Sequence, residues 1–273
     1  MQASFHWSPP GGALGTILRA AQVRADFLER GRDDLTADAA ETLPGPSLER
    51  AMRTGSVAVL AEVKRRSPSK GAIAESLVAV DQARAYARGG AAGVSILTEP
   101  EHFGGSVDDL RAVRRALDIP VLKKDFHVAP IQLLEARALG ASAALLIARA
   151  LSPARLDELV AYGRAIGLEL LVEVRDEDEL TRALAAGATM IGVNNRNLET
   201  LEIEHGTAER LIPSMPPSVV AIAESGVRHR GDVERYAACG ADAVLVGSVL
   251  SASSDPAGAS QALTGVPRRT RGG

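Results

Sequence analysis

The chain has 273 residues and a mass of 28.5 kDa, with 46% hydrophobic and 24% charged residues, as in ordinary soluble globular proteins. The formal net charge of −3 and the isoelectric point near 6.0 argue against a nucleic-acid-binding protein, which usually carries a basic patch or stripe. A single cysteine excludes an internal disulfide framework, and no uncharged apolar run approaches the ~18 residues of a membrane span. Because residues 1–12 lack the features of a secretory signal, we expect a cytoplasmic protein.

Eight short apolar runs recur along the chain, and each is a candidate buried strand. They begin at Val57, Gly93, Pro120, Ala143, Glu169, Met190, Val219 and Ala243. Segments of helical spacing and helix-forming composition separate the runs, and several end in a glycine that can close a helix in the left-handed conformation. Strands that alternate with helices predict parallel pairing through right-handed crossovers.

Two architectures fit this alternation, a closed (β/α)8 barrel and an open doubly wound sheet. Eight runs of near-uniform spacing in a chain close to ~250 residues favour the barrel. An open sheet that binds a dinucleotide would need a Gly-x-Gly-x-x-Gly loop after the first strand, whereas residues 64–71 read Lys-Arg-Arg-Ser-Pro-Ser-Lys-Gly. We therefore predict an α/β fold, a (β/α)8 TIM barrel with an N-terminal helical extension.

The chain divides into three parts. Residues 1–56 form the helical extension and a linker, and we expect them to cover the rim or the bottom of the barrel. Residues 57–250 form the barrel core, and residues 251–273 a C-terminal helix and tail. The end of the tail, residues 267–273, is rich in arginine, glycine and proline, and we expect it to be disordered.

Charged and amide side chains gather where the predicted strands end. Alternation along the first strand places Glu62 and Lys64 on one face. Five more polar residues follow at the ends of later strands: Lys124, Glu173, Asn194, Arg196 and Glu224. Any one of them could be a solvated loop charge or part of an ion pair that plugs the barrel mouth. Barrel enzymes place their chemistry at this end, however, and several acids and bases directed into one mouth must pair or bind a ligand. We predict a site for general acid–base catalysis.

Serine–glycine pairs follow the last two predicted strands, as Ser225–Gly226 and Gly247–Ser248. In phosphate-binding barrels these two loops hold the phosphate through backbone N–H groups, which glycine leaves accessible. Either pair alone could be a plain turn, but the two together favour a phosphate site. Ser67, in the loop after the first strand, could add a hydroxyl donor.

Other candidate residues give weaker signals. Phe103 either anchors its own loop or supplies an apolar face for a ring of the substrate. The five histidines are scattered without metal-binding spacing, so we predict no metal site.

Seven segments together resemble the indole-3-glycerol phosphate synthase family. They run in the order of the family and are AEVKRRSPSKG (61–71), SILTEPEHFGGS (95–106), PVLKKDF (120–126), LLVEV (170–174), IGVNNRNLETLEI (191–203), AIAESG (221–226) and LVGS (245–248). The resemblance implies conversion of 1-(2-carboxyphenylamino)-1-deoxyribulose 5-phosphate to indole-3-glycerol phosphate, CO2 and water, in tryptophan biosynthesis. It also implies that the reaction needs no cofactor and no metal.

The same resemblance implies roles for the site residues. Lys124 resembles the general acid that protonates the ribulose carbonyl oxygen during ring closure, and Glu173 its acid–base partner in the later dehydration. Lys64 would pair with the anthranilate carboxylate, Glu62 would assist proton transfer, and Asn194 would orient the substrate as part of the catalytic set. The residues implied to bind substrate are Ser67, Phe103, Arg196, Glu224 and Ser225, and those implied to bind its phosphate are Gly226, Gly247 and Ser248.

Two other functions remain open from the residues alone. One is a different phosphosugar barrel, an isomerase or an aldolase with a Schiff-base lysine. The other is a catalytically inactive barrel that only binds a phosphorylated ligand. In each case the expected partner is a small phosphorylated molecule, with no nucleic acid and no membrane. A monomer is expected, and docking to other enzymes of tryptophan biosynthesis stays open.

Overall fold

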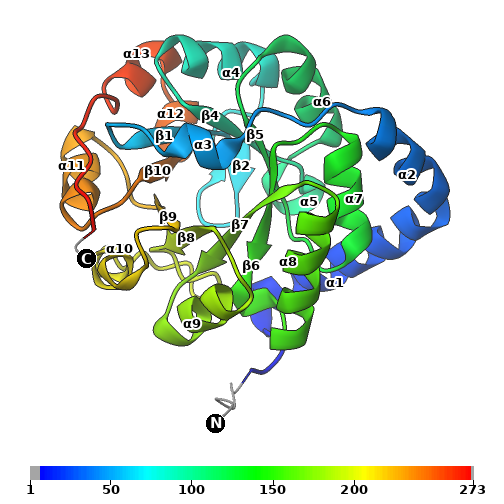
Figure 1. The fold of residues 1–273 in the computed structure, drawn as a ribbon. Helices are drawn as coiled ribbons and strands as arrows, with labels where there is room; N and C mark the ends of the chain where they lie inside the picture. The colour runs from blue at the N-terminus through cyan, green and yellow to red at the C-terminus, as the bar shows by residue number, and fades with distance from the viewer. Residues whose placement is uncertain (1–6, 272–273) are drawn as a thin grey trace.

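The computed structural model describes residues 7–271, and its parallel strands close into a barrel with helices around it (Figure 1). In spatial order the barrel strands are β1 (Ala58–Val63), β10 (Ala243–Val246), β9 (Val220–Glu224), β8 (Met190–Asn194), β7 (Glu169–Val174), β6 (Ala143–Ile147), β5 (Val121–Lys124) and β4 (Gly93–Leu97). The first and last of them along the chain pair with each other, with Leu60 opposite Leu245. The predicted (β/α)8 barrel is therefore confirmed, and the open sheet is excluded.

Helices surround the barrel; most of them connect consecutive strands, and α12 and α13 follow the last strand. They are α4 (Ala79–Arg88), α5 (Pro100–Phe103), α6 (Val107–Ala116), α7 (Pro130–Ala138), α8 (Pro153–Ala165), α9 (Glu177–Ala185), α10 (Gly206–Leu211), α11 (Arg230–Ala238), α12 (Ser248–Ser251) and α13 (Pro256–Gln261), with short 3-10 turns at 148–150 and 212–214. Helices α8 and α9 begin at the capping residues that the sequence indicates. The side chains of Ser152 and Asp176 accept hydrogen bonds from backbone N–H groups of the first turn, which would otherwise lack partners.

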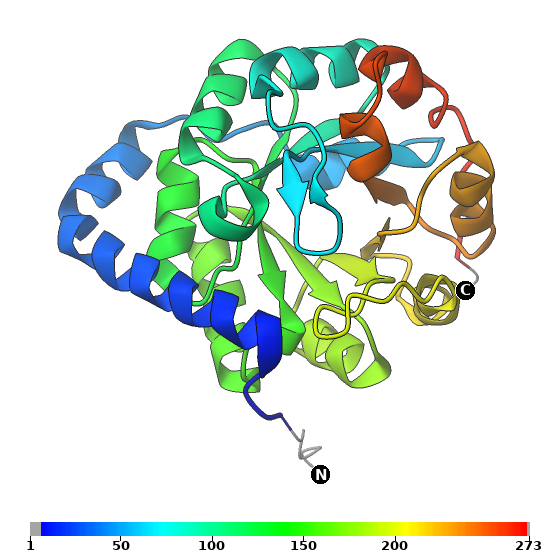
Figure 2. The same cartoon turned by 180° about the vertical axis from the view of Figure 1, so that it is seen from behind.

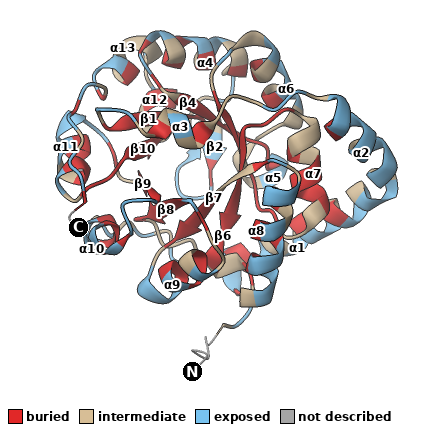
Figure 3. Cartoon of the chain, viewed as in Figure 1, coloured by how far each residue is buried: buried red, intermediate tan, exposed pale blue. Residues whose placement is uncertain are grey.

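The apolar core has two layers because side chains alternate across each strand. Leu122 and Leu171 point into the barrel, where they join one buried cluster. Their neighbours Val121 and Val172 point outward and pack against the helices in a second, larger cluster. Figure 3 shows the resulting pattern, with buried strands at the centre and helices that are buried only on their inner faces.

The N-terminal extension covers both ends of the barrel. It consists of α1 (Gly12–Leu28), a 3-10 turn (Glu29–Gly31), α2 (Arg32–Glu41) and α3 (Leu48–Met52). Leu14 and Ile17 of α1 join the inner cluster at the carboxyl ends of the strands, whereas Leu48 and Met52 of α3 join it at the amino ends. Figure 2 shows α1 in dark blue and the loop after β1 in cyan, both on the side of the barrel that faces the viewer. The extension therefore contributes to the barrel mouth.

Residues 267–271 of the tail are ordered, so the expectation that they are disordered is wrong. Arg268 and Arg271 form ion pairs of 2.6 Å and 2.9 Å with Asp242, and the Arg271 side chain is 3% exposed. Pro267 forms a β-bridge with Ser56 beside the start of β1. Residues 267–271 are thus held because two guanidinium groups neutralise a buried carboxylate, while residues 272–273, like residues 1–6, lie outside the described residues. Within residues 7–271, no helix is long and apolar enough to span a membrane.

Candidate active site

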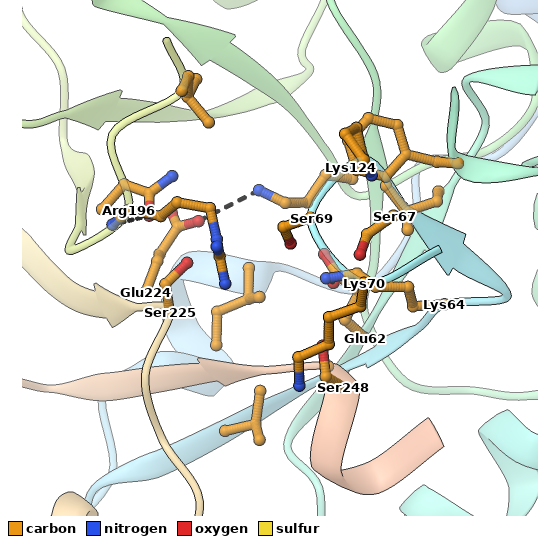
Figure 4. A pocket seen from close by; sticks show the side chains of 18 of the residues that line it. Glu62, Lys64, Ser67, Ser69, Lys70, Lys124, Arg196, Glu224, Ser225 and Ser248 are labelled. Atoms are coloured by element: carbon orange, nitrogen blue, oxygen red, sulfur yellow. Dashed lines mark hydrogen bonds and ion pairs between the residues drawn. The ribbon is translucent and has the colours of Figure 1, made fainter. Parts of the chain in front are cut away.

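A cavity of about 760 Å³ opens at the carboxyl ends of the barrel strands (Figure 4). Every residue that the sequence predicts for the site lines it: Glu62, Lys64, Ser67, Phe103, Lys124, Glu173, Asn194, Arg196, Glu224, Ser225, Gly226, Gly247 and Ser248. The structure thus brings together residues that are up to 186 positions apart in the sequence, from Glu62 to Ser248.

One layer of inward-pointing residues forms the polar floor of the cavity. Glu62, Lys124, Glu173, Asn194 and Glu224 lie at or next to the ends of five different strands. Four of them stand two positions after a residue of the inner apolar cluster, and Asn194 stands two positions after a glycine. Because side chains alternate along a strand, these residues point into the barrel, as the inner cluster does. Because rigid, hydrogen-bonded strands hold these side chains, the floor is preorganised before any substrate binds.

Lys124 lies between two carboxylates of this floor. Its ammonium nitrogen is 3.1 Å from Glu224 Oε2 and 3.4 Å from Glu173 Oε2. Burial lowers the pKa of Lys124, but the negative charges of Glu224 and of the other two glutamates outweigh burial and hold this pKa above its ordinary value. Lys124 is therefore an ammonium group at neutral pH, with protons to donate.

Glu224 is the most perturbed acid of the floor. Burial raises the pKa of its carboxyl group to about 7, because the loss of hydration outweighs the attraction of Lys124. Its Oε1 atom has no hydrogen-bond partner among the described residues and occupies the space where a Cβ atom at position 192 would lie. Glycine at 192 in β8 is thus the residue that leaves room for this carboxyl group.

Glu62 and Lys64 form a second ion pair at the other side of the mouth. Glu62 is 1% exposed, and Lys64 is the only cation of the described chain within ion-pair distance of it. A Cβ atom at position 247 would collide with the same carboxylate and lie 3.1 Å from the Lys64 ammonium. Gly247 therefore lets the last loop of the barrel pack directly on the pair.

Asn194 connects Glu173 to the loop after β8. Its side-chain amide donates a 2.9 Å hydrogen bond to Glu173 Oε1 and accepts one of 2.9 Å from the backbone N–H of Arg196. Arg196 donates to the backbone carbonyl of Leu201, at 2.6 Å, and has no carboxylate partner in the described chain. This arrangement orients Glu173 and leaves the charge of Arg196 available to an anionic ligand.

The loops after β9 and β10 form the predicted phosphate end of the cavity. Ser225 has a φ of 63°, a left-handed conformation that is costly for a residue with a side chain. Gly226 follows with a φ of 92°, and a Cβ atom there would lie 2.7 Å from the His205 ring. Ser248 begins the short helix α12 directly after Gly247. Glycine thus lets both loops pass closely along the cavity wall.

The structure adds residues that sequence reasoning does not assign. Lys70 lies at the turn of the hairpin formed by β2 (Arg66–Ser67) and β3 (Gly71–Ala72), and Figure 4 shows it extending toward Ser248. The opposite wall is apolar and includes Leu14 and Ile17 from α1. Lys70 falls within the quoted loop 61–71 and could have been found there, but no local pattern reveals that α1 reaches the mouth.

Two aromatic rings face each other on this apolar wall. The ring centroids of Phe103, at the end of α5, and Phe126, just after β5, are 6.1 Å apart and the rings are tilted by 37°. Both residues line the cavity. Aromatic and aliphatic surface on one side, with charges on the floor, suits a ligand that has an aromatic ring and anionic groups.

The charges of the cavity are largely compensated, with three exceptions. Four acids line it (Glu62, Asp125, Glu173 and Glu224), and so do five cations (Lys64, Lys70, Lys124, Arg196 and Arg228). Lys64 and Lys124 pair with the floor acids, and Asp125 pairs with Arg24 of α1. Within residues 7–271, Lys70, Arg196 and Arg228 form no ion pair, so the cavity favours an anion. No cluster of three or more potential metal ligands occurs in the same part of the chain.

The barrel is closed, acid–base groups are buried at its mouth, and the loops after β9 and β10 have the form of phosphate-binding loops. These features define a TIM-barrel enzyme for a small phosphorylated substrate. The family model for indole-3-glycerol phosphate synthase matches residues 17–263. The chain belongs to this family of carboxy-lyases of tryptophan biosynthesis, which confirms the resemblance seen in its motifs.

Curated relatives agree over nearly the whole chain. Indole-3-glycerol phosphate synthase 1 of Streptomyces coelicolor is 51% identical over 86% of this chain and 88% of its own length. Indole-3-glycerol phosphate synthase of Mycobacteroides abscessus is 50% identical over 91% of this chain and 92% of its own length. Among solved structures, 3-hexulose-6-phosphate synthase of Salmonella typhimurium has a TM-score of 0.61 at 16% identity, over 76% of this chain and 96% of that one, which shows the shared fold alone.

Proposed function

We propose that the chain carries out the indole-3-glycerol phosphate synthase reaction in this cavity, with Lys124 as general acid. The observation that carries the assignment is the position of Lys124, held between Glu173 and Glu224 on a cavity floor that faces the loops after β9 and β10. The aromatic end of 1-(2-carboxyphenylamino)-1-deoxyribulose 5-phosphate would lie against Phe103 and its phosphate against those loops.

The first step would be ring closure. The ring carbon that bears the carboxylate attacks the ribulose carbonyl carbon, and a C–C bond forms. The electrons of the C=O bond move to its oxygen, which takes a proton from the Lys124 ammonium. A positioned acid of this kind contributes about 10²–10⁴ to a rate. Lys64 would hold the carboxylate of the substrate and so orient the attacking carbon.

Decarboxylation and dehydration would follow. The bond to the carboxylate breaks, CO2 leaves, and its electron pair restores the aromatic ring. Glu173, a carboxylate beside Lys124 in the resting site, takes up a proton from solvent and passes it to the new hydroxyl group, which leaves as water; Asn194 orients Glu173 through a 2.9 Å hydrogen bond. The neighbouring C–H group loses its proton to the Glu62 carboxylate, and the indole double bond forms. Overall the reaction takes up one proton from solvent.

The substrate would be anchored by its phosphate. Backbone groups of Gly226 and Gly247, with the Ser225 and Ser248 hydroxyls, line that end of the cavity, and Ser67 lies in the hairpin next to it. Arg196 and Lys70 supply charge that no carboxylate of the described chain neutralises. A doubly charged phosphate is therefore favoured at this end.

Replacing Lys70 tests the phosphate end. We expect Lys70→Met to raise KM about tenfold and leave kcat within about twofold, because the contact is the same in ground and transition states. Steady-state kinetics at low and high ionic strength measure the effect, which should shrink with salt. Lys70→Arg is the matched control and keeps most of the affinity. A fall in kcat, or an unchanged KM, would contradict this role.

The reaction itself is tested by incubating the purified chain with 1-(2-carboxyphenylamino)-1-deoxyribulose 5-phosphate in the presence of EDTA. The indole product fluoresces, and Trp7 is the only indole group in the protein. We expect a saturable increase in emission that EDTA does not change. If the substrate binds but the emission does not increase, the chain is an inactive barrel that only binds a phosphorylated ligand. A borohydride-trapped lysine adduct would instead indicate Schiff-base chemistry.

The setting of the reaction is part of the proposal. We propose that the chain works in the cytoplasm, where its single cysteine stays reduced, and that it acts as a monomer. The cavity supports a monomer because residues 7–271 of one chain supply its floor, its phosphate end and its apolar wall. Light scattering of the purified chain measures this directly.

A further inference from the structure

A charged side chain of the N-terminal helix α1 contacts the loops that carry Phe103 and Phe126 of the apolar wall. Arg24 of α1 forms an ion pair of 2.7 Å with Asp125 and one of 3.7 Å with Glu99. Glu99 is 0% and Asp125 6% exposed, so each carboxylate depends on protein partners for its stability. One guanidinium group therefore joins the loop after β4 to the loop after β5.

Each of these two acids fixes the backbone of one aromatic residue. Glu99 Oε2 accepts hydrogen bonds from the backbone N–H groups of His102 at 2.7 Å and Phe103 at 3.0 Å, which caps α5. Asp125 Oδ1 accepts the backbone N–H of Phe126 at 2.8 Å, and its Oδ2 accepts the Thr98 hydroxyl at 2.7 Å. The relative position of the two rings thus depends on the relative position of Glu99 and Asp125.

We propose that Arg24 is a positioning residue that sets the spacing of Phe103 and Phe126 and so shapes the subsite for the aromatic ring of the substrate. This inference rests on the proposed function, which places that ring against the apolar wall. Arg24 would act at one end of the substrate only. The phosphate loops follow β9 and β10, and neither Glu99 nor Asp125 makes a hydrogen bond or an ion pair with their residues.

A comparison of two inhibitors tests the inference. The reduced substrate analogue 1-(2-carboxyphenylamino)-1-deoxyribitol 5-phosphate occupies both ends of the cavity, whereas inorganic phosphate occupies only the phosphate end. We expect Arg24→Met to raise the inhibition constant of the analogue about tenfold, because aromatic contacts and their geometry are lost. The inhibition constant of phosphate should stay within about twofold.

Two further variants complete the test. Arg24→Lys should give an intermediate effect, because an ammonium group cannot bridge both acids as a guanidinium does. Arg19→Met is the matched control on the same helix, since Arg19 is exposed and, within residues 7–271, its side chain forms a hydrogen bond only with Thr16; this variant should behave as wild type.

The outcomes separate the two proposals. Parallel rises of both inhibition constants, or no rise in either, would overturn the role of Arg24. If the unmodified chain neither forms product nor binds the analogue, the proposed function fails first. If the unmodified chain forms product and binds the analogue, and Arg24→Met has the same inhibition constants, the proposed function stands and only the role of Arg24 fails.

Discussion

Lys124→Ala is expected to lower kcat by about 10³-fold or more while substrate affinity changes by less than about tenfold. The ammonium group would donate its proton in the transition state, so its loss affects the chemical step more than binding. Lys124 is half-buried on the cavity floor, and its contacts with Glu173 and Glu224 hold the ammonium group in one place. Single-turnover kinetics and binding of the reduced analogue separate the two quantities.

A loss of folding must be distinguished from a loss of chemistry in this variant. Without Lys124, two buried carboxylates face each other with no cation between them. The double variant Lys124→Ala with Glu224→Gln removes one of these charges and should recover thermal stability without recovering turnover. Near wild-type kcat in either variant would mean that another group supplies the proton.

Glu224→Gln is expected to stabilise the folded chain at pH 8 and to impair turnover. Burial raises the pKa of Glu224 from its usual 4.5 to about 7, so the folded state holds a proton that the unfolded state has released between these two values. The stability of the native chain therefore falls as pH rises through this window. At about 1.4 kcal/mol per pKa unit, the cost of this shift at pH 8 is on the order of 3 kcal/mol.

Urea unfolding at two pH values measures this effect. Near pH 4.5 the Glu224 carboxyl group is largely protonated in the folded state, so Glu224→Gln and the wild type should differ little there. At pH 8 the variant should be the more stable protein, because the glutamine is never charged. Equal differences at both pH values would show that ionisation of Glu224 is not the cause. The variant should turn over more slowly, since Lys124 loses one of its two carboxylate partners.

The fold and the polar floor could be predicted because they depend on short-range regularities. The period of two along each strand determines that Glu173 faces the same way as Leu171. The barrel then gathers the ends of all its strands at one mouth. No knowledge of loop structure was needed to place Lys124 or Asn194 in the cavity, since both stand at the ends of strands.

Contacts between distant loops could not be predicted in the same way. Arg24 and Asp125 are 101 positions apart, and their pairing depends on how α1 docks across the mouth. No pattern within α1 indicates that docking, and the same holds for Leu14 and Ile17. The tail has a composition typical of disorder, yet Arg271 is buried because Asp242 lies beneath it. Composition does not report the presence of such a partner.

The ion pair between Glu62 and Lys64 has a consequence for product release if Lys64 binds the substrate carboxylate as proposed. A substrate carboxylate that binds Lys64 must compete with the carboxylate that the protein already provides. Decarboxylation would remove the competing charge as CO2, and Lys64 could pair with Glu62 again once the reaction is complete. With Lys64 in the proposed role, substrate binding would be an exchange of counter-ions that the reaction itself reverses. The product would then be held by one ion pair fewer than the substrate, so we expect it to bind more weakly than the substrate analogue.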